Sequence, residues 1–362
     1  MATQLLNQRL FSGSSPKKTT ADMPRSIKPQ PIPSDALRLK SKVKDLCYNC
    51  SGSRLYVASR DGVTVLDTEG LTAHCALSVR CTRVLTHPKD PDLFALLLME
   101  GGETPRAYVK VFSLPQNAGS EPVLKCTIWS GFEHPWYAGA WSSDGNTIAL
   151  LDRGDHLQCA DVSTFADCEL PASSAISLTT EVYGLMYTSD ALVLQKVDGR
   201  IDILSPDLTV RASEQAHSHI VMATAYNSSR DLLATGGSDH TVHLFSCADD
   251  YTCVGTFPGL EGKVSSLSFS NDGMLLAWGT KDTLYVSGDN PNQSDTSTTG
   301  DEYYMTVAGT DPCEIYIQVR MPVAVTHVQF SPCGYSVAYA CDFDSMPKGS
   351  GSTGAVGIVR LL

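Results

Sequence analysis

The sequence predicts an all-β fold: a seven-bladed β-propeller of four-stranded antiparallel blades, with the ring closed by an N-terminal strand. The first observation is the stretch Ala216–Ser246, where short apolar runs alternate with Asn/Asp/Gly/Ser turns, as in β-hairpins. The second is that this unit recurs at spacings of roughly 40 to 60 residues, as propeller repeats do. The third is that the last unit lacks one strand, which the start of the chain can supply.

The repeated units share the order of strand, polar turn, strand and tight turn. Their first turns read alike, as in Ser142–Gly145 (SSDG), Ser270–Gly273 (SNDG) and Ser331–Gly334 (SPCG). One such sheet cannot bury both of its faces, so it needs copies of itself on either side. The units are Val43–Leu66, Arg83–Phe112, Tyr137–Cys159, Val182–Leu204, Ala216–Ser246, Lys263–Val286 and Val323–Arg360.

The final unit has no outer strand of its own, because the sequence stops at Leu362 directly after its third predicted strand. Ala36–Lys40 (ALRLK) alternates apolar and basic residues just before the first unit. We expect this segment to be the outer strand of the final blade, which would close the ring and remove two exposed sheet edges. The propeller domain is therefore expected over 35–362.

Two segments depart from the repeat pattern. Residues 1–34 are rich in Ser, Pro and Lys, and we expect a disordered N-terminal tail there. The alternatives for this tail are an organelle transit peptide and a short nuclear-import or partner-docking segment. Residues 288–312 are acidic and rich in Ser and Thr, so we expect a loop insertion that ends where a strand resumes at Cys313.

Composition excludes several kinds of protein. A formal net charge of −12 does not fit a protein that grips nucleic-acid phosphates by itself, so a partner would make most of any such contact. No stretch approaches the ~18 apolar residues of a membrane-spanning helix, and the N-terminus lacks the apolar core of a secretory signal. Cys47 and Cys50 form a CxxC without a second pair at zinc-site spacing. We expect no metal, cofactor, membrane or small-molecule substrate.

No catalytic or nucleotide-binding motif stands in a supporting context, so the chain is predicted not to be an enzyme. His217 and Asp239 look like an acid–base pair, but the unit that holds them resembles a WD repeat. In such repeats, a His before the inner strand and the Asp of the later tight turn form a structural brace. Thr235 can add a hydroxyl to this brace, whereas Phe245 takes the place where these repeats often carry Trp.

The loops before the inner strands are the second candidate site, because partners of propellers commonly bind on that rim. Phe132 and Trp136 lie just before a predicted inner strand, and Arg106 and Arg153 lie in loops of the same rim. Aromatic and arginine side chains are common anchors of protein interfaces, so all four are candidate partner-binding residues. For the two aromatic residues, packing between blades is the competing interpretation.

Four segments resemble the WD-repeat subunit of the THO complex, its subunit 3, and occur in the same order. They are His87–Phe94 (HPKDPDLF), Asp198–Ser205 (DGRIDILS), Val264–Gly273 (VSSLSFSNDG) and Val337–Asp342 (VAYACD). They are similar to that family's HPxxPDLF, GxINILS, VRTLSFSHDG and LAFACDD. The resemblance covers nearly the whole chain after the tail. The insertion over 288–312 and the Phe at position 245 depart from the family pattern and mark a distant member.

The resemblance implies a non-enzymatic scaffold subunit of the nuclear THO/TREX assembly, which couples transcription to mRNA processing and export. Its expected partners are large helical THO subunits and, indirectly, a DEAD-box helicase and mRNA. Two alternatives stay open. One is a substrate receptor or chromatin-complex scaffold of a ubiquitin ligase or histone-modifying enzyme, which would carry an acidic or aromatic pocket at the central channel. The other is an organellar or ciliary scaffold, which removal of the N-terminal tail would favour.

Overall fold

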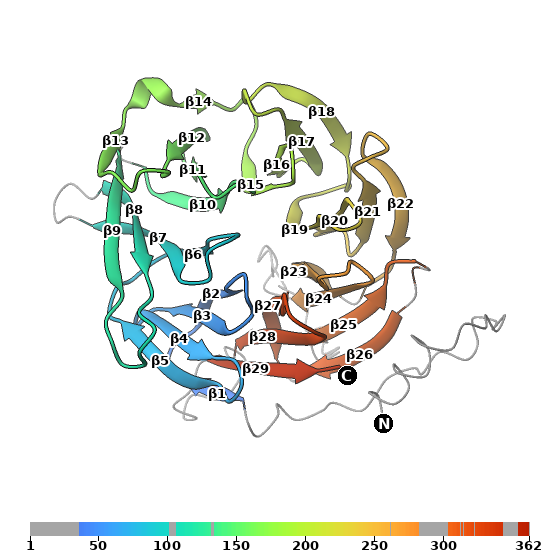
Figure 1. Ribbon diagram of the computed structural model, residues 1–362. Helices are drawn as coiled ribbons and strands as arrows, with labels where there is room; N and C mark the ends of the chain where they lie inside the picture. Colours follow the sequence, from blue (N-terminus) through green and yellow to red (C-terminus); the bar gives the residue numbers. More distant parts are fainter. Residues whose placement is uncertain are drawn as a thin grey trace, which may run out of the picture.

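Seven β-sheets stand around a central axis in the computed structural model of the protein (Figure 1). The structure describes residues 36–100, 106–131, 134–260, 262–281, 303–311, 313, 315–321, 323–342 and 354–361. Each sheet is one blade, and its strands are arranged side by side from the axis outward. The predicted all-β, seven-bladed propeller is confirmed. Within these ranges, no helix is long and apolar enough to cross a membrane.

The first three blades follow one another along the chain, and in each of them the innermost strand comes first. Blade 1 holds β2 (Val43–Tyr48), β3 (Arg54–Ser59), β4 (Val63–Asp67) and β5 (Thr72–Leu77). Blade 2 holds β6 (Arg83–Thr86), β7 (Leu93–Glu100), β8 (Arg106–Ser113) and β9 (Val123–Ser130). Blade 3 holds β10 (Trp136–Trp141), β11 (Thr147–Asp152), β12 (His156–Asp161) and β14 (Ile176–Ser177).

The remaining blades complete the ring. Blade 4 holds β15 (Val182–Tyr187), β16 (Leu192–Lys196), β17 (Arg200–Leu204) and β18 (Val210–Gln215). Blade 5 holds β19 (Val221–Asn227), β20 (Leu232–Gly237), β21 (Val242–Ser246) and β22 (Thr252–Phe257). Blade 6 holds β23 (Lys263–Phe269), β24 (Leu275–Lys281), β25 (Tyr303–Gly309) and β26 (Ile315–Met321). Blade 7 holds β27 (Ala324–Phe330), β28 (Ser336–Asp342), β29 (Gly354–Arg360) and β1 (Leu37–Leu39).

The hydrophobic core lies between neighbouring blades. In β19, fully buried and half-buried residues alternate, because successive side chains point to opposite faces of a strand. Between blades 5 and 6, Trp278 is 1% exposed, and its ring centroid lies 5.1 Å from that of Phe257. A buried ring of this size stabilises a fold by about 3–5 kcal/mol relative to alanine. Each blade therefore depends on its neighbours for stability.

The strand nearest the N-terminus closes the ring. β1 pairs antiparallel with β29, so that Leu37 stands opposite Val356 and Leu39 stands opposite Gly354. Leu37 and Leu39 pack against the core between blades 7 and 1, whereas Ala36 packs in the core between blades 6 and 7. The prediction that this segment is the outer strand of the final blade is confirmed.

The prediction of a loop over residues 288–312 is wrong for the C-terminal part of that range. Residues Tyr303–Gly309 (YYMTVAG) form β25, the third strand of blade 6, and all are buried. The segment has no charged residue and carries aromatic and apolar side chains, which suit a strand that is buried on both faces. The acidic residues that precede it concealed this strand in the sequence pattern. Residues 1–34 and 288–302 lie outside the described part of the chain.

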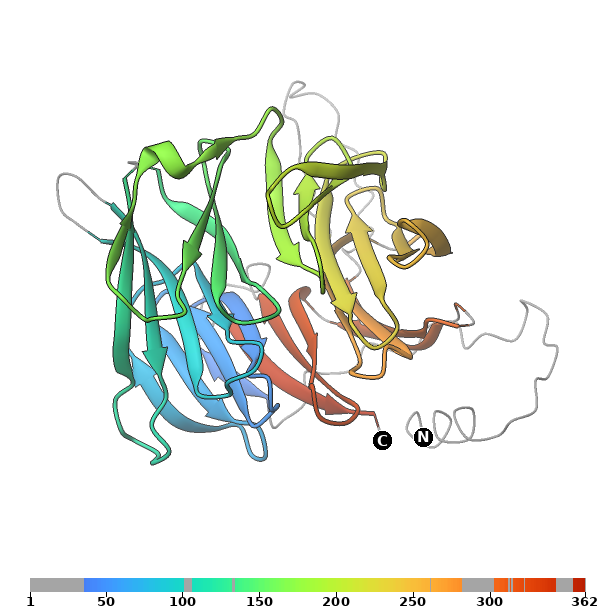
Figure 2. The same ribbon diagram turned by 45° about the horizontal axis from the view of Figure 1, so that its top comes forward.

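Blade 2 carries a fifth strand that the sequence analysis did not predict. After β12 the chain crosses to blade 2, where β13 (Cys168–Leu170) pairs parallel with β9. It then passes through the 3-10 turn η1 (Ala172–Ser174) and returns as β14, which pairs only with His156 and Leu157 of β12. Figure 2 shows this crossing in green on the outer side of the two blades. We call residues 162–175 the strap.

Removing residues 34–41 deletes β1, leaves β29 with an open edge and uncovers the core between blades 7 and 1. We expect cooperative destabilisation of the whole domain, measured as a lower melting temperature by circular dichroism. The milder variant Leu37→Ser/Leu39→Ser should lower the free energy of unfolding by about 2–4 kcal/mol, because two partly buried leucines are lost. The control Leu37→Ile/Leu39→Ile should cost less than about 1.5 kcal/mol. An unchanged melting temperature for the deletion would contradict this prediction.

Candidate interaction site at the mouth of the central channel

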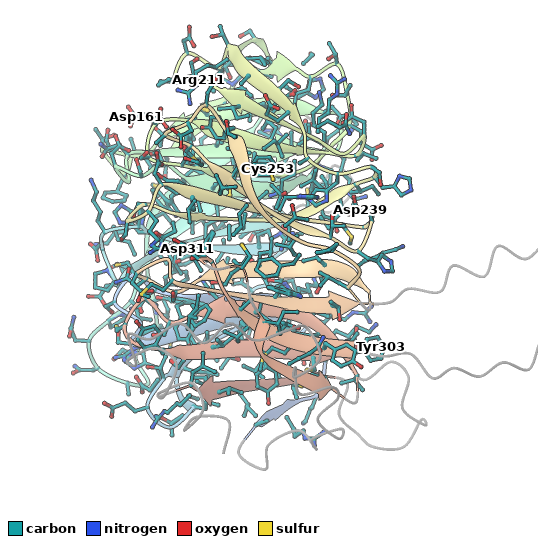
Figure 3. All side chains as sticks on the ribbon, turned by 90° about the vertical axis from the view of Figure 1, so that its right-hand side faces the viewer. Asp161, Arg211, Asp239, Cys253, Tyr303 and Asp311 are labelled. Atoms are coloured by element: carbon teal, nitrogen blue, oxygen red, sulfur yellow. The ribbon has the colours of Figure 1, made fainter. Side chains whose placement is uncertain are left out.

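The propeller has two unlike faces. The connections between blades, such as 78–82, and those between second and third strands, such as 153–155, open on one face, which we call the loop face. The other turns open on the opposite face, which we call the turn face. In the side view of Figure 3, Asp239 lies at the loop-face edge, whereas Asp161 and Asp311 lie at the turn-face edge.

A cavity of about 680 Å³ opens on the loop face at the inner ends of blades 1 to 4. We call it the channel-mouth cavity. Lys44, Tyr137 and Tyr183 are the second residues of β2, β10 and β15, so successive inner strands bring one repeat position to the same place. The lining residues are Lys44, Thr82, Arg83, Tyr137, Arg153, Asp155, Glu181, Val182 and Tyr183.

The charges of this cavity are only partly neutralised within the protein. Lys44 Nζ donates a hydrogen bond to the carbonyl of Cys81 at 3.4 Å. The Arg83 guanidinium lies 3.5 Å from Asp45, whose carboxylate also accepts the backbone N–H of Val84 at 2.8 Å. Neither Arg153 nor Glu181 forms a side-chain hydrogen bond or ion pair with another described residue. Opposite charges thus line one cavity without pairing, which leaves both able to engage a partner.

The two tyrosines of the cavity have different roles. The Tyr137 hydroxyl donates to the carbonyl of Val182 and ties blade 3 to blade 4. Burial, together with the nearby carboxylates of Asp155 and Glu181, raises the pKa of Tyr137 well above its usual value. Tyr183, by contrast, is 42% exposed. An exposed aromatic ring in the same cavity as arginines is typical of an interface anchor.

Of the four rim residues predicted from sequence, the structure brings only Arg153 into this cavity. Arg106 is exposed at the start of β8 and does not line the cavity. The prediction that Trp136 anchors a partner is wrong, because its side chain is 2% exposed and packs in the core between blades 2 and 3. Trp136 begins the inner strand β10, and its ring packs between blades 2 and 3. Phe132 lies outside the described residues.

Sequence reasoning missed most residues of the channel-mouth cavity. Lys44, Tyr137 and Tyr183 share a position in the repeat, the second residue of the inner strand, and Arg83 begins the inner strand β6. Their residue types differ from blade to blade, so no motif marks them. The available signal was the position itself, because the first residues of neighbouring inner strands must converge on the channel.

The predicted brace residues of blade 5 form one hydrogen-bonded set. His217 Nδ1 lies 2.9 Å from Asp239 Oδ1, and His217 Nε2 lies 2.8 Å from Thr235 Oγ1. The other carboxylate oxygen of Asp239 accepts the backbone N–H of Ser218 at 2.9 Å. Thr241, which the sequence analysis did not name, donates its hydroxyl to Asp239 Oδ1 at 2.8 Å. The set joins the loop between blades 4 and 5 to the second strand and tight turn of blade 5.

The brace holds a neutral histidine. A carboxylate only accepts hydrogen bonds, so His217 Nδ1 donates to Asp239 and His217 Nε2 accepts from Thr235. Burial lowers the pKa of His217, although the Asp239 carboxylate opposes this. Burial raises the pKa of Asp239, but hydrogen bonds from Ser218, Thr241 and His217 outweigh it, so the net shift is downward. Because His217 is 3% exposed, the pair is a structural joint that a substrate does not reach.

Blade 3 contains a second histidine–carboxylate pair that the sequence analysis did not name. Asp152 is fully buried, and its Oδ1 accepts the backbone N–H groups of Gly154 and His156 at 2.8 and 2.9 Å. The ring Nδ1 of His156 lies 3.1 Å from Asp152 Oδ2. These contacts fix the turn that carries Arg153 and Asp155 into the cavity. Among the residues that the structure describes, no group of His, Cys, Asp and Glu is placed to hold a metal ion.

Replacing His217 with Ala should destabilise the protein, because Thr235 and Asp239 lose a buried hydrogen-bond partner. We expect the free energy of unfolding to fall by about 2–4 kcal/mol, measured by urea denaturation. The matched control is His219→Ala in the same loop, an exposed residue whose side chain, among the described residues, forms a hydrogen bond only with the adjacent carbonyl of Ser218. It should change stability by less than about 0.5 kcal/mol. Equal effects of the two substitutions would contradict the brace.

The free energy of unfolding should decrease as the pH is lowered below about 6.5, which is the usual pKa of histidine in an unfolded chain. Burial lowers the pKa of His217 and of His243, so the folded protein binds fewer protons than the unfolded chain in this range. Their contribution is fully present above the unfolded pKa and is lost as pH falls toward the folded values. Melting temperatures at pH 7.5 and 5.5 test this, and the difference should shrink in His217→Gln but not in His219→Gln. A flat wild-type profile would be the contrary result.

Comparisons with known proteins agree with this architecture. Residues 209–246 and 251–289 match the WD40 family model, described as "WD domain, G-beta repeat". The chain is also similar to the crystal structure of the Cps50 (Swd1) beta-propeller domain of Myceliophteria thermophila, with a TM-score of 0.63. Identity is 14%, and the match covers 89% of this chain and 98% of that one, a likeness that concerns the fold alone. WD-repeat propellers are typically non-enzymatic scaffolds. This chain is a seven-bladed β-propeller with WD repeats in the stretch from β18 to β24.

Proposed function

We propose that the protein is a non-enzymatic scaffold that binds other proteins at its loop face. The channel-mouth cavity is the observation that carries this proposal. Arg83, Arg153 and Tyr183 are residue types that dominate the energetics of protein interfaces, and three different blades supply them. Because rigid strands and braced turns hold these side chains, a partner binds them with little loss of backbone freedom.

We further propose that this scaffold is the WD-repeat subunit of a nuclear THO/TREX assembly. The support is the sequence resemblance, whose segments fall on parts of the propeller body. Val264–Gly273 covers most of β23 and the turn after it, and Val337–Asp342 covers most of β28. The partners would then be large helical THO subunits, with a DEAD-box helicase and mRNA held indirectly. The proposal includes no cofactor and no small-molecule substrate.

A second candidate is a substrate receptor or chromatin-complex scaffold for a ubiquitin ligase or a histone-modifying enzyme. One specific observation favours it, because Asp155, Glu181 and two tyrosines line the channel mouth, where such a receptor would carry an acidic or aromatic pocket. The cations Lys44, Arg83 and Arg153 in the same cavity favour the THO scaffold, since a pocket for a basic tail would not need them.

Mild affinity purification of the tagged protein from its own cells tests the proposal. We expect large helical THO subunits and a DEAD-box helicase to be recovered by mass spectrometry, and to survive nuclease treatment because protein contacts hold them. Purification of the His217→Ala variant, which leaves the channel-mouth cavity in place, controls for stability. Recovery of a cullin adaptor, a chromatin enzyme or a mitochondrial set would contradict the THO assignment and leave the scaffold function standing.

A further inference from the structure

Cations gather on one sector of the loop face, although the whole chain has a formal net charge of −12. Blades 1 to 3 supply them from the starts of inner strands and from connecting loops. Four of the five residues are exposed, and the side chain of the fifth, Arg83, is 40% exposed. We call this set the cationic sector: Lys44, Arg60, Arg80, Arg83 and Arg153.

Hydrogen bonds link the chain segments that carry these cations. Lys44 Nζ reaches the carbonyl of Cys81, the residue that follows Arg80. The Ser41 hydroxyl, in the connection that leads into β2, donates to the Asp61 carboxylate at 2.9 Å, next to Arg60. At the inner end, the remaining members line the channel-mouth cavity together. The sector therefore runs from the tight turn of blade 1 to the mouth of the channel.

The carboxylate nearest to Arg83 is already engaged. Asp45 is buried and accepts the backbone N–H groups of Leu46 and Val84 at 3.1 and 2.8 Å, as well as facing Arg83. Arg60, Arg80 and Arg153 make no hydrogen bond or ion pair with any other described residue. The positive charge of the sector is thus left to attract an anionic partner.

The ring-closing segment Arg38–Lys44 (RLKSKVK) continues the sector toward the outer rim. Every second residue is a cation, while Leu39 and Val43 between them pack toward the core between blades 7 and 1. The first three cations of this segment already have interaction partners, among them the pair of Lys42 with Asp342 at 3.1 Å.

We propose that the cationic sector binds an acidic peptide segment of a partner protein. This inference rests on the proposed scaffold function. The exposed guanidinium groups of Arg60, Arg80 and Arg153, which pair with no described carboxylate, complement the charge of Asp and Glu side chains in such a segment. The exposed ring of Tyr183 lies in the cavity at the inner end of the sector, where it can pack against an apolar side chain of the peptide.

A peptide fits this surface better than a nucleic acid. Asp155 and Glu181 line the inner end of the sector, where a peptide can place an uncharged side chain, whereas a nucleic acid carries a phosphate at every nucleotide. Binding of single-stranded nucleic acid uses several aromatic side chains that stack successive bases. Among the described lining residues of the cavity, Tyr183 is the one exposed aromatic side chain, since Tyr137 is engaged with Val182.

Fluorescence anisotropy with a labelled twelve-residue peptide of alternating Glu and Thr, ending in Leu, tests the proposal on the full chain. The variant Lys44→Glu/Arg80→Glu should weaken binding by at least about tenfold, because two favourable charge contacts become repulsive. The control Lys89→Glu/Lys125→Glu makes the same charge change at two exposed residues away from the sector and should change affinity less than about twofold. Both variants should keep the wild-type melting temperature.

Each other outcome has a defined meaning. Equal affinities of the two variants would overturn the proposal, as would tighter binding of a labelled twelve-nucleotide oligouridine that is lost in the same sector variant. Purified helical THO subunits separate this inference from the proposed function. If the wild type and the sector variant retain them equally, the scaffold function stands and the acidic-segment site fails. If the wild type retains none while the peptide result holds, the site stands without the THO assignment.

Discussion

The structure depends on burial between blades, because no blade has a core of its own. Tyr56 of blade 1 is fully buried against Phe94 of blade 2, with the ring centroids 4.9 Å apart, and similar clusters fill the other interfaces. This arrangement is stable only if the last interface is also filled. β1 completes it with three residues, whose leucines reach the core between blades 7 and 1. A small strand therefore controls the stability of a large domain.

Local sequence signals predicted the seven-bladed fold. They did not predict features that depend on contacts between distant parts of the chain. Turn residues such as Gly145 and Gly273, which adopt positive φ, mark hairpins whatever surrounds them, so the seven blades could be recognised directly. β25 was missed because acidic neighbours masked an apolar strand. β13 was missed because parallel pairing with a neighbouring blade leaves no local pattern. Of the site residues, the brace of His217, Asp239 and Thr235 could be predicted from the repeat. The direction of the Trp136 ring could not, since the first side chain of a strand can point toward the rim or between the blades.

Net charge and local charge lead to different expectations for this chain. The total of −12 indicates a protein that does not hold nucleic acid alone, and it gives no hint of the cations around the channel mouth. Carboxylates such as Asp144 and Asp207 lie in turns on the opposite face, where hydrogen bonds from Ser142 and Thr209 lower their pKa and keep them ionised. The propeller thus presents surfaces of different charge to different partners, as a scaffold requires.

The strap couples the local unfolding of blades 2 and 3. Neighbouring blades elsewhere touch mainly through side chains, whereas blade 3 lends β13 to the sheet of blade 2 through backbone hydrogen bonds. Local unfolding of blade 3 would strip a strand from blade 2 as well. We therefore expect the two blades to behave as a single cooperative unit in amide hydrogen exchange. Residues of both blades line the channel-mouth cavity. Partner binding in this cavity would stiffen both blades together.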